Sequence, residues 1–485
     1  MRFNRVVGRT KTESDGGRTT MLNHVVKLIL VLLIAFTPLP QGSVHFWAFS
    51  SMELGILAIL VLWAAGQLKD QQALPRPLPR AAFIFLFLFL ALALLQVVPL
   101  PGGVVDLLSP RTYDLRHQLK AGDGPLGAVA LSLFPFATKI EFLKWMVLSG
   151  FFLFFLHWRL PEKGIRVIKQ LIVVILIMGT FEAFYGLFRF FGAQNHVPAL
   201  EGAEDIYSVM GTFINRNHFA GYLLMVIPLG VGLLYSREAH RLPVKGSRLH
   251  RLTFLDAKTL LIGFSVIIMI LGLLFSASRM GIVSLLLSFS VVSILFKRSE
   301  NGKGFSKRSV WILGLAVLWA ASIGLDAVIS RFFGTSGDFH VRWRIWEGTV
   351  QMIRDFPLFG AGLGTFTQVF PMYRSFHIRG LATHAENDFL QLASEAGLLG
   401  FTLLLILFVV LFVRAASGIR SLSAVDPRRY IGIGGLVGIL ALMFHSQVER
   451  NLQVPANAFL YALLWGIVLK ISSRNMEKIS MGKNP

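Results

Sequence analysis

The side chains most able to do chemistry gather just before one of the late apolar runs. At helical spacing they fall on one face: His384, Asn387, Asp388, Gln391 and Glu395. A polar stripe leading into an apolar run is costly in a membrane unless it faces water or a polar ligand. An imidazole titrates at about pH 6.5, so it can take a proton from a hydroxyl near neutrality. His384 is therefore a candidate base, the alternative being a loop histidine packed beside a helix cap.

Two arginines stand at the edges of apolar runs. Arg216 lies near the end of one run, and Arg279 lies in the tight turn between two others. An arginine at mid-bilayer costs roughly 2.5–3.5 kcal/mol on insertion scales, and a boundary position avoids this cost. Because guanidinium groups bind phosphate oxygens in a bidentate manner, the pair is a candidate phosphate clamp. The alternative is that both side chains extend to lipid headgroups.

The elements that position these residues are long apolar segments. The chain is 54% hydrophobic and 15% charged, whereas soluble domains carry about a quarter charged residues. Runs of about 18 or more apolar residues predict bilayer-spanning helices. We predict an all-α polytopic membrane protein with about twelve spans, near 25–40, 44–66, 81–100, 139–158, 166–188, 211–235, 259–277, 280–296, 310–329, 396–413, 431–447 and 455–471. The absence of cysteine excludes disulfides and cysteine-based metal sites.

The positions of the charges decide what the net charge of +21 means. In a soluble protein such an excess would suggest nucleic acid. Here most Lys and Arg residues fall in the tails and in the alternating loops of one side, as the positive-inside rule requires. We therefore predict cytoplasmic termini and no nucleic-acid partner. The first span is interpreted as a retained signal-anchor, the alternative being a cleaved signal.

These assignments divide the chain into five parts. They are an N-tail (1–24), nine spans (25–329), a large outside loop (330–395), three spans (396–471) and a C-tail (472–485). Two further outside segments are too long to be simple turns. They cover 101–138, with a possible helix around Ser109–Leu119, and 189–210.

Two helices are expected inside the large loop. The first covers Val341–Phe356 and lies at the lipid interface, with an apolar face made by Trp343, Trp346, Val350 and Ile353. The second begins at Thr383, which has capping-box spacing to Glu386, and runs into the tenth span. Between them, Gly360–Gly364 forms a glycine-rich turn that resembles a phosphate loop only weakly.

Four segments of the sequence resemble the bacterial O-antigen ligases and O-antigen polymerases. The resemblance extends over about 211–470, and it is the order of the segments that makes it specific. They are GTFINRNHFAGYL (211–223), SASRMG (276–281), Arg344–Trp346 through Pro357–Gly362, and HAENDFLQ (384–391) continuing to Glu395–Gly397. Many members have a second histidine where this chain has Glu386, which leaves His384 as the histidine of the motif.

The resemblance implies a GT-C-like membrane glycosyltransferase of the bacterial inner membrane. Such an enzyme transfers a glycan from undecaprenyl pyrophosphate to a sugar hydroxyl at the periplasmic face. The acceptor is lipid A-core in the ligases and another lipid-linked repeat unit in the polymerases. On this basis His384 is the base, Arg216 and Arg279 hold the pyrophosphate, and three residues are candidates for binding the glycan: Asn387, Gln391 and Arg344.

No cofactor and no metal are expected. The chain has no Asp-x-Asp motif, so arginines would supply the positive charge. We expect smaller contributions from Glu395, as the partner of a loop arginine, and from the outer-turn residues His445, Glu449 and Arg450. Two other classes stay open, a protein O-oligosaccharyltransferase and a lipid-linked-oligosaccharide flippase or transporter. A transporter is expected to show repeated halves and polar residues at mid-membrane.

Overall fold

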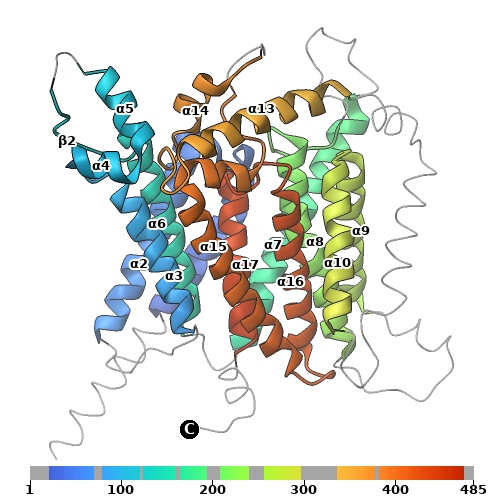
Figure 1. Ribbon diagram of the computed structural model, residues 1–485. Helices are drawn as coiled ribbons and strands as arrows, with labels where there is room; N and C mark the ends of the chain where they lie inside the picture. Colours follow the sequence, from blue (N-terminus) through green and yellow to red (C-terminus); the bar gives the residue numbers. More distant parts are fainter. Residues whose placement is uncertain are drawn as a thin grey trace, which may run out of the picture.

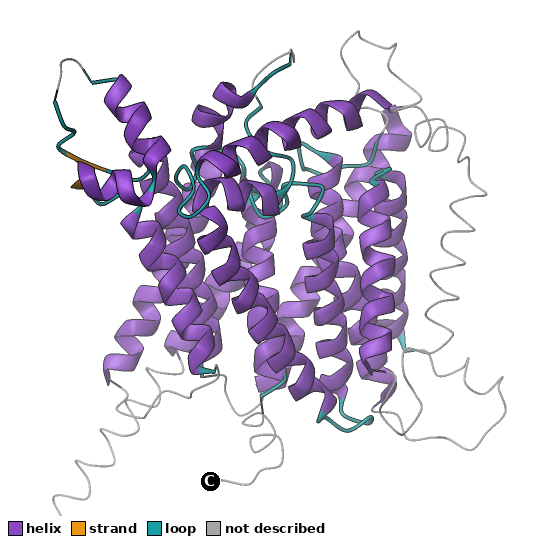
Figure 2. Ribbon diagram, in the orientation of Figure 1, coloured by secondary structure: helices purple, strands orange, loops and turns teal. Residues whose placement is uncertain are grey.

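The apolar runs of the sequence become the helices of a bundle. The computed structural model describes residues 21–69, 79–120, 124–159, 164–193, 208–239, 256–296, 336–376 and 382–473. Within these ranges nearly all regular structure is helical (Figure 2). The one sheet in the described part pairs β1 (Leu100–Pro101) with β2 (Ala128–Val129) in antiparallel fashion. The prediction of an all-α chain is confirmed.

The longer helices lie side by side through the body of the molecule (Figure 1). They are Met21–Phe36, α2 (Phe46–Lys69), α3 (Arg80–Leu95), α6 (Pro135–His157), α7 (Gly164–Ala193), α8 (Arg216–Ala239), α9 (Ala257–Phe275), α10 (Arg279–Phe296), α15 (Asp388–Arg420), α16 (Pro427–His445) and α17 (Pro455–Ile471). A short 3₁₀ helix, η1 (Gln41–Ser43), joins the first two.

Eight of the described helices are long and apolar enough to cross a membrane, namely α2, α6, α7, α8, α9, α10, α15 and α16. Met21–Phe36, α3 and α17 are shorter apolar helices. All of these coincide with expected spans. The expected ninth span, near 310–329, lies outside the described residues. The polytopic architecture is therefore confirmed, whereas the count of twelve and the GT-C-like fold stay predictions.

Glycines allow α8 and α16 to pack closely along each other. A Cβ atom added at Gly434 would lie 2.3 Å from the carbonyl oxygen of Pro228, and one added at Gly438 would lie 3.0 Å from that of Met225. Small residues at such positions let membrane helices approach until their backbones touch. This contact holds α8 beside α16, and so brings their ends at one side of the bundle together.

Helices that are not part of the bundle cover one of its ends, at the top of Figure 1, which we call the capped end. They are α4 (Gly102–Leu108), α5 (Pro110–Gln118), α13 (Ser336–Asp355), α14 (Phe366–Val369) and the 3₁₀ helix η4 (Phe370–Tyr373). Asp355 links three of them, because it accepts a hydrogen bond from the Tyr373 hydroxyl at 2.7 Å and lies 3.4 Å from Arg111. The expected helices around Ser109–Leu119 and Val341–Phe356 are confirmed as α5 and α13.

The face that α13 buries differs from the expected one. Its side against the protein carries Ile345, Thr349 and Met352, all almost fully buried. Trp343 is 50% exposed and Val350 is 36% exposed, although both were assigned to the apolar face. Apolar residues occur on more than one side of this helix, so periodicity alone did not show which side packs inward. The exposed tryptophan agrees with a helix at a lipid interface.

The beginning of α15 also differs from the expectation. Glu386 has a φ of 51°, in the left-handed region, so no helix can run through it from Thr383. Instead Asn387 caps the helix, and its side-chain oxygen accepts from the N–H groups of Phe389 and Leu390 at 3.0 Å. The predicted capping box is therefore wrong, and the helix starts at Asp388.

A break in α15 at Gly397, where φ is 70°, separates its first turns from the long apolar part. The glycine-rich turn packs against this break: the N–H groups of Ala361 and Gly362 donate to the carbonyls of Ser394 and Glu395 at 3.0 Å. A Cβ atom at Gly360 would lie 2.2 Å from the Glu395 carbonyl oxygen. The glycines are therefore explained by the close approach of two backbones.

Candidate functional site

The loop that carries His384 is held by three elements of the capped end. The Thr367 hydroxyl of α14 donates to the carbonyl of Thr383 at 3.0 Å. The Trp346 indole of α13 donates to the carbonyl of Ala385 at 3.1 Å. The Gln391 side chain of α15 accepts from the N–H of Ala385 at 3.2 Å. These contacts fix the backbone on both sides of His384.

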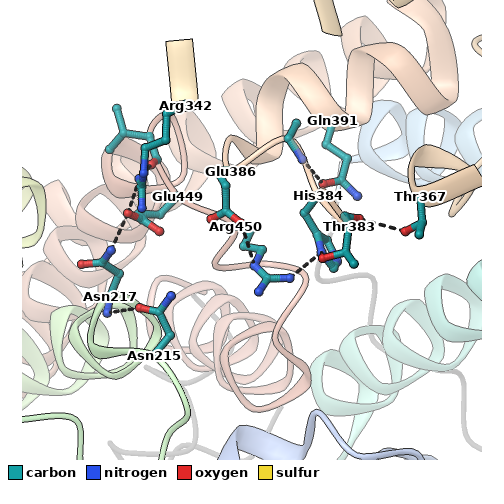
Figure 3. Close-up of polar contacts among 12 residues, drawn as sticks. Asn215, Asn217, Arg342, Thr367, Thr383, His384, Glu386, Gln391, Glu449 and Arg450 are labelled. Atoms are coloured by element: carbon teal, nitrogen blue, oxygen red, sulfur yellow. Dashed lines mark hydrogen bonds and ion pairs between the residues drawn. The ribbon is translucent and has the colours of Figure 1, made fainter. Parts of the chain in front are cut away.

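His384 is half-buried, and its ring lies beside the guanidinium group of Arg450 (Figure 3). Its Nδ1 atom is 2.9 Å from the Thr383 hydroxyl and accepts a hydrogen bond from Arg450 Nη1. Burial, followed by the positive charges of Arg450 and Lys144, lowers the pKa of His384 from 6.5 to about 3. The imidazole is therefore neutral at physiological pH. Burial and the neighbouring cations are therefore the causes of this neutrality.

Arg450 bridges two residues of the His384 loop. Besides its contact with His384, its Nε atom lies 3.3 Å from Glu386 Oε1. Its side chain is 27% exposed and that of Glu386 is 22% exposed. Glu386 is thus an ion-pair partner rather than the helix-capping residue that was expected. Arg450 comes from the turn between α16 and α17, so the site joins segments that are distant in sequence.

A second ion pair stands beside this cluster (Figure 3). Arg342 of α13 contacts Glu449 at 2.5 Å and donates to the carbonyl of Val448 at 2.7 Å. The Asn217 amide of α8 donates to the same Glu449 oxygen at 2.6 Å. Burial raises the pKa of Glu449 to about 7, although Arg342 opposes this shift. Glu449 therefore ties α13 and α8 to the turn between α16 and α17.

The same turn also anchors the first residues of α15. The N–H of Asp388 donates to the carbonyl of Ser446 at 2.9 Å, and its carboxylate accepts from the N–H of Leu452 at 2.8 Å. The Asn387 amide donates to the carbonyl of Gln447 at 2.6 Å. The turn between α16 and α17 therefore fixes the end of the His384 loop at Asn387 and Asp388, while α13 and α14 hold the backbone next to His384.

Arg216 and Arg279 are the first residues of α8 and α10, and both are half-buried. Their helix ends lie at the capped end. Asn217 contacts Glu449, and the Ser278 hydroxyl lies 3.4 Å from His445 Nε2 at the end of α16. The structure thus places both arginines on the same side of the bundle as His384. Their assignment to a pyrophosphate stays a prediction.

The three candidate glycan-binding residues have different surroundings. Asn387 caps α15 with its oxygen and donates to Gln447 with its nitrogen. Gln391 is 3% exposed and uses both ends of its amide, accepting from Ala385 and donating to Glu395 at 3.2 Å. Arg344 is exposed on α13, 3.9 Å from Glu347. Sugar binding by any of them stays a prediction.

Glu395 differs from the expectation of an ion pair with a loop arginine. It is 2% exposed, and its carboxylate accepts from the N–H groups of Gly364 at 2.9 Å and Phe366 at 3.1 Å, besides Gln391. Backbone donors therefore satisfy this carboxylate where an arginine was expected. Its role is to hold the glycine-rich turn against α15.

Sequence reasoning underrated Arg450, Glu449 and Arg342. The available signal was an adjacent acid and base, Glu449 and Arg450, in a short turn between two apolar runs. Their contacts could not be read from the sequence, because Arg450 and His384 are 66 positions apart and Arg342 and Glu449 are 107 apart.

Comparison with known families assigns the segment that contains the His384 loop. Residues 264–405 match the model of a family described as O-antigen ligase. This match supports the resemblance of the chain to the O-antigen ligase/polymerase superfamily. The O-antigen ligase segment starts within α9 and ends within α15, so it includes Arg279, Arg344 and His384. Arg216 and Arg450 lie outside it. No curated protein matches the chain.

The O-antigen ligase family also bears on the chemistry to be expected. It indicates an enzyme resembling a glycosyltransferase that works in cell-surface polysaccharide biosynthesis, with a lipid-linked glycan and an acceptor as substrates. Among the residues in the described ranges, no three His, Asp or Glu side chains come together as a metal site. Metal independence itself stays a prediction.

Proposed function

We propose that this protein is a metal-independent glycosyltransferase of the bacterial inner membrane. It transfers a glycan from undecaprenyl pyrophosphate to a sugar hydroxyl at the periplasmic face, which is the capped end of the bundle. The observation that carries the proposal is His384, a half-buried neutral imidazole beside Arg450, within a segment of the O-antigen ligase family.

The reaction requires one proton transfer and one exchange of bonds. The acceptor hydroxyl loses its proton to His384 as its oxygen attacks the anomeric carbon of the donor sugar. The bond from that carbon to the pyrophosphate oxygen breaks. Undecaprenyl pyrophosphate is the leaving group, and its oxygen keeps the bonding electrons. The proton on His384 then passes to water. No redox partner is needed.

The charges at the capped end suit this donor. Arg216 and Arg279 begin α8 and α10 at that end, where the headgroup of a membrane-embedded lipid would lie. Guanidinium groups can bind the pyrophosphate and stabilise the negative charge that develops as it leaves. Apolar surfaces of the spanning helices would accept the undecaprenyl chain. Arg344, exposed on α13, can meet the glycan from above.

The test is to offer the purified protein an undecaprenyl-pyrophosphate glycan, with and without lipid A-core, and to analyse the products by gel electrophoresis and mass spectrometry. Core-dependent transfer would identify a ligase, and growth of the glycan without core would identify a polymerase. If glycan is transferred to neither acceptor although the donor binds, the proposed reaction is wrong. Addition of EDTA to a productive reaction should leave the rate unchanged, and a loss restored by metal would contradict metal independence.

A further inference from the structure

The hydrogen bond between Arg450 and His384 determines where the imidazole proton lies. A guanidinium group has only N–H donors, so the Nδ1 atom that it meets must act as an acceptor. A neutral imidazole carries one proton on one nitrogen, which here must be Nε2. An Nε2 atom that already carries a proton has no free electron pair and cannot accept a second proton, while the electron pair of Nδ1 is occupied by the hydrogen bond from Arg450. In this arrangement neither nitrogen of His384 can act as a base toward an acceptor.

Thr383 offers His384 the alternative arrangement. Its hydroxyl lies 2.9 Å from the same Nδ1 atom and can either donate or accept. If Arg450 moves away, Nδ1 can carry the proton and donate it to the Thr383 oxygen. Nε2 then has a free electron pair. Only this second tautomer can accept a proton at Nε2.

Arg450 is suited to such a move. Its side chain is 27% exposed, and its two partners in the loop, His384 and Glu386, contact it from one segment. Neither contact is a bidentate pair with two parallel hydrogen bonds, because Glu386 meets only Nε, at 3.3 Å. A pyrophosphate offers several negatively charged oxygens, which can accept two parallel hydrogen bonds from the guanidinium fork, whereas neither present partner does so.

We infer that Arg450 is a positioning residue that sets the tautomer of His384, and that the donor pyrophosphate switches it by drawing Arg450 away. This inference rests on the proposed function, since it concerns the same base and the same donor. The switch leaves the number of protons on the imidazole unchanged, because Nε2 releases one proton to water and Nδ1 takes one up from water. The consequence is an ordered reaction in which the base becomes competent only after the donor has bound.

The tautomer can be observed directly by ¹⁵N NMR of histidine-labelled protein in lipid nanodiscs, using His384→Ala to assign the signal. The probe is undecaprenyl pyrophosphate without a glycan, so no transfer takes place. We expect the Nε2–H tautomer in the wild type alone, and the Nδ1–H tautomer once the probe is added. An unchanged Nε2–H tautomer at saturating probe would overturn the inference.

Variants separate the role of Arg450 from a general effect on the fold. Arg450→Ala should give the Nδ1–H tautomer without the probe, whereas Arg450→Lys, which also donates, should keep Nε2–H. Arg354→Ala is the matched control, since Arg354 is an exposed arginine of α13, and it should behave as the wild type. If Arg450→Ala keeps the Nε2–H tautomer, the inference is wrong. Should Arg450→Ala fail to fold, the addition of undecaprenyl pyrophosphate to the wild-type protein decides alone.

The outcomes distinguish the inference from the proposed function. A tautomer switch in a protein that transfers no glycan would support the role of Arg450 and reject the reaction. Transfer by a protein whose His384 keeps the Nε2–H tautomer with the probe bound would support the reaction and reject the switch.

Discussion

The carboxylate of Asp388 accepts a hydrogen bond from the backbone N–H of Leu452 at 2.8 Å. This contact joins the first residue of α15 to the turn between α16 and α17, which carries Arg450. Asp388 directly follows Asn387, which caps the helix. The bond therefore also fixes the position of the last residues of the His384 loop relative to this turn. The relative position of His384 and Arg450 therefore depends on it.

Replacing Asp388 tests this anchor. Asp388→Ala leaves the buried N–H of Leu452 without an acceptor, which typically costs about 1–3 kcal/mol. Asp388→Asn keeps one side-chain oxygen and should cost clearly less. Thermal unfolding of the detergent-solubilised protein measures both, and the alanine variant should unfold at the lower temperature. Equal unfolding temperatures for both variants and the wild type would mean that the bond contributes nothing to stability.

Arg342 is expected to control the pH dependence of stability through Glu449. Burial raises the pKa of Glu449 from 4.5 to about 7, so the folded protein binds this proton more tightly than the unfolded chain. The stability that comes from this tighter proton binding by Glu449 is therefore fully present below pH 4.5. It is lost as the pH rises through about 7. Arg342→Ala removes the opposing charge and should cost on the order of 3 kcal/mol when Glu449 is ionised.

The measurement is thermal unfolding of Arg342→Ala across this pH range. The loss of stability relative to the wild type should grow with pH, and adding Glu449→Gln should remove that growth. A loss that is the same at every pH would show that Glu449 is not the group responsible.

Arg450 should also control the pH dependence of transfer. Burial and the charges of Arg450, Lys144 and His218 together lower the pKa of His384 to about 3. The wild-type kcat/KM for the donor should therefore show no loss from His384 protonation between about pH 5 and 7. Arg450→Ala raises the pKa of His384, since it removes the largest charge contribution, and shifts the acidic limb of the rate profile to higher pH. The pH dependence of kcat/KM for the donor measures this, because that ratio reports the pKa values of the free enzyme, in which Arg450 still contacts His384. An acidic limb at the wild-type position would contradict the prediction.

Arg216 and Arg279 should act on the donor. Hydrogen bonds to charged groups contribute about 1.5–3 kcal/mol, so Arg216→Ala and Arg279→Ala should each raise KM for the donor by roughly tenfold to a hundredfold. Arg354→Ala, at an exposed site on α13, is the control. Kinetics with varied undecaprenyl-pyrophosphate glycan measures the effect. Near-normal KM in both variants would leave contact with lipid headgroups as their role.

The spans could be predicted from the sequence because burial in lipid demands long apolar runs. The described helices match those runs, and residue type and position made His384, Arg216 and Arg279 candidates whose roles stay predictions. The surroundings of His384 were not predictable, because they come from Arg450 and Trp346, which are distant in sequence. The start of α15 was misplaced for a local reason, since Glu386 adopts a left-handed conformation that spacing does not reveal.

The most direct measurement is glycan transfer by purified His384→Ala compared with the wild type, with donor binding and thermal unfolding recorded for both. If His384 is the base, the rate should fall by at least about a hundredfold, while donor binding and stability are retained. Transfer by His384→Ala at close to the wild-type rate would contradict the assignment of His384 as the catalytic base.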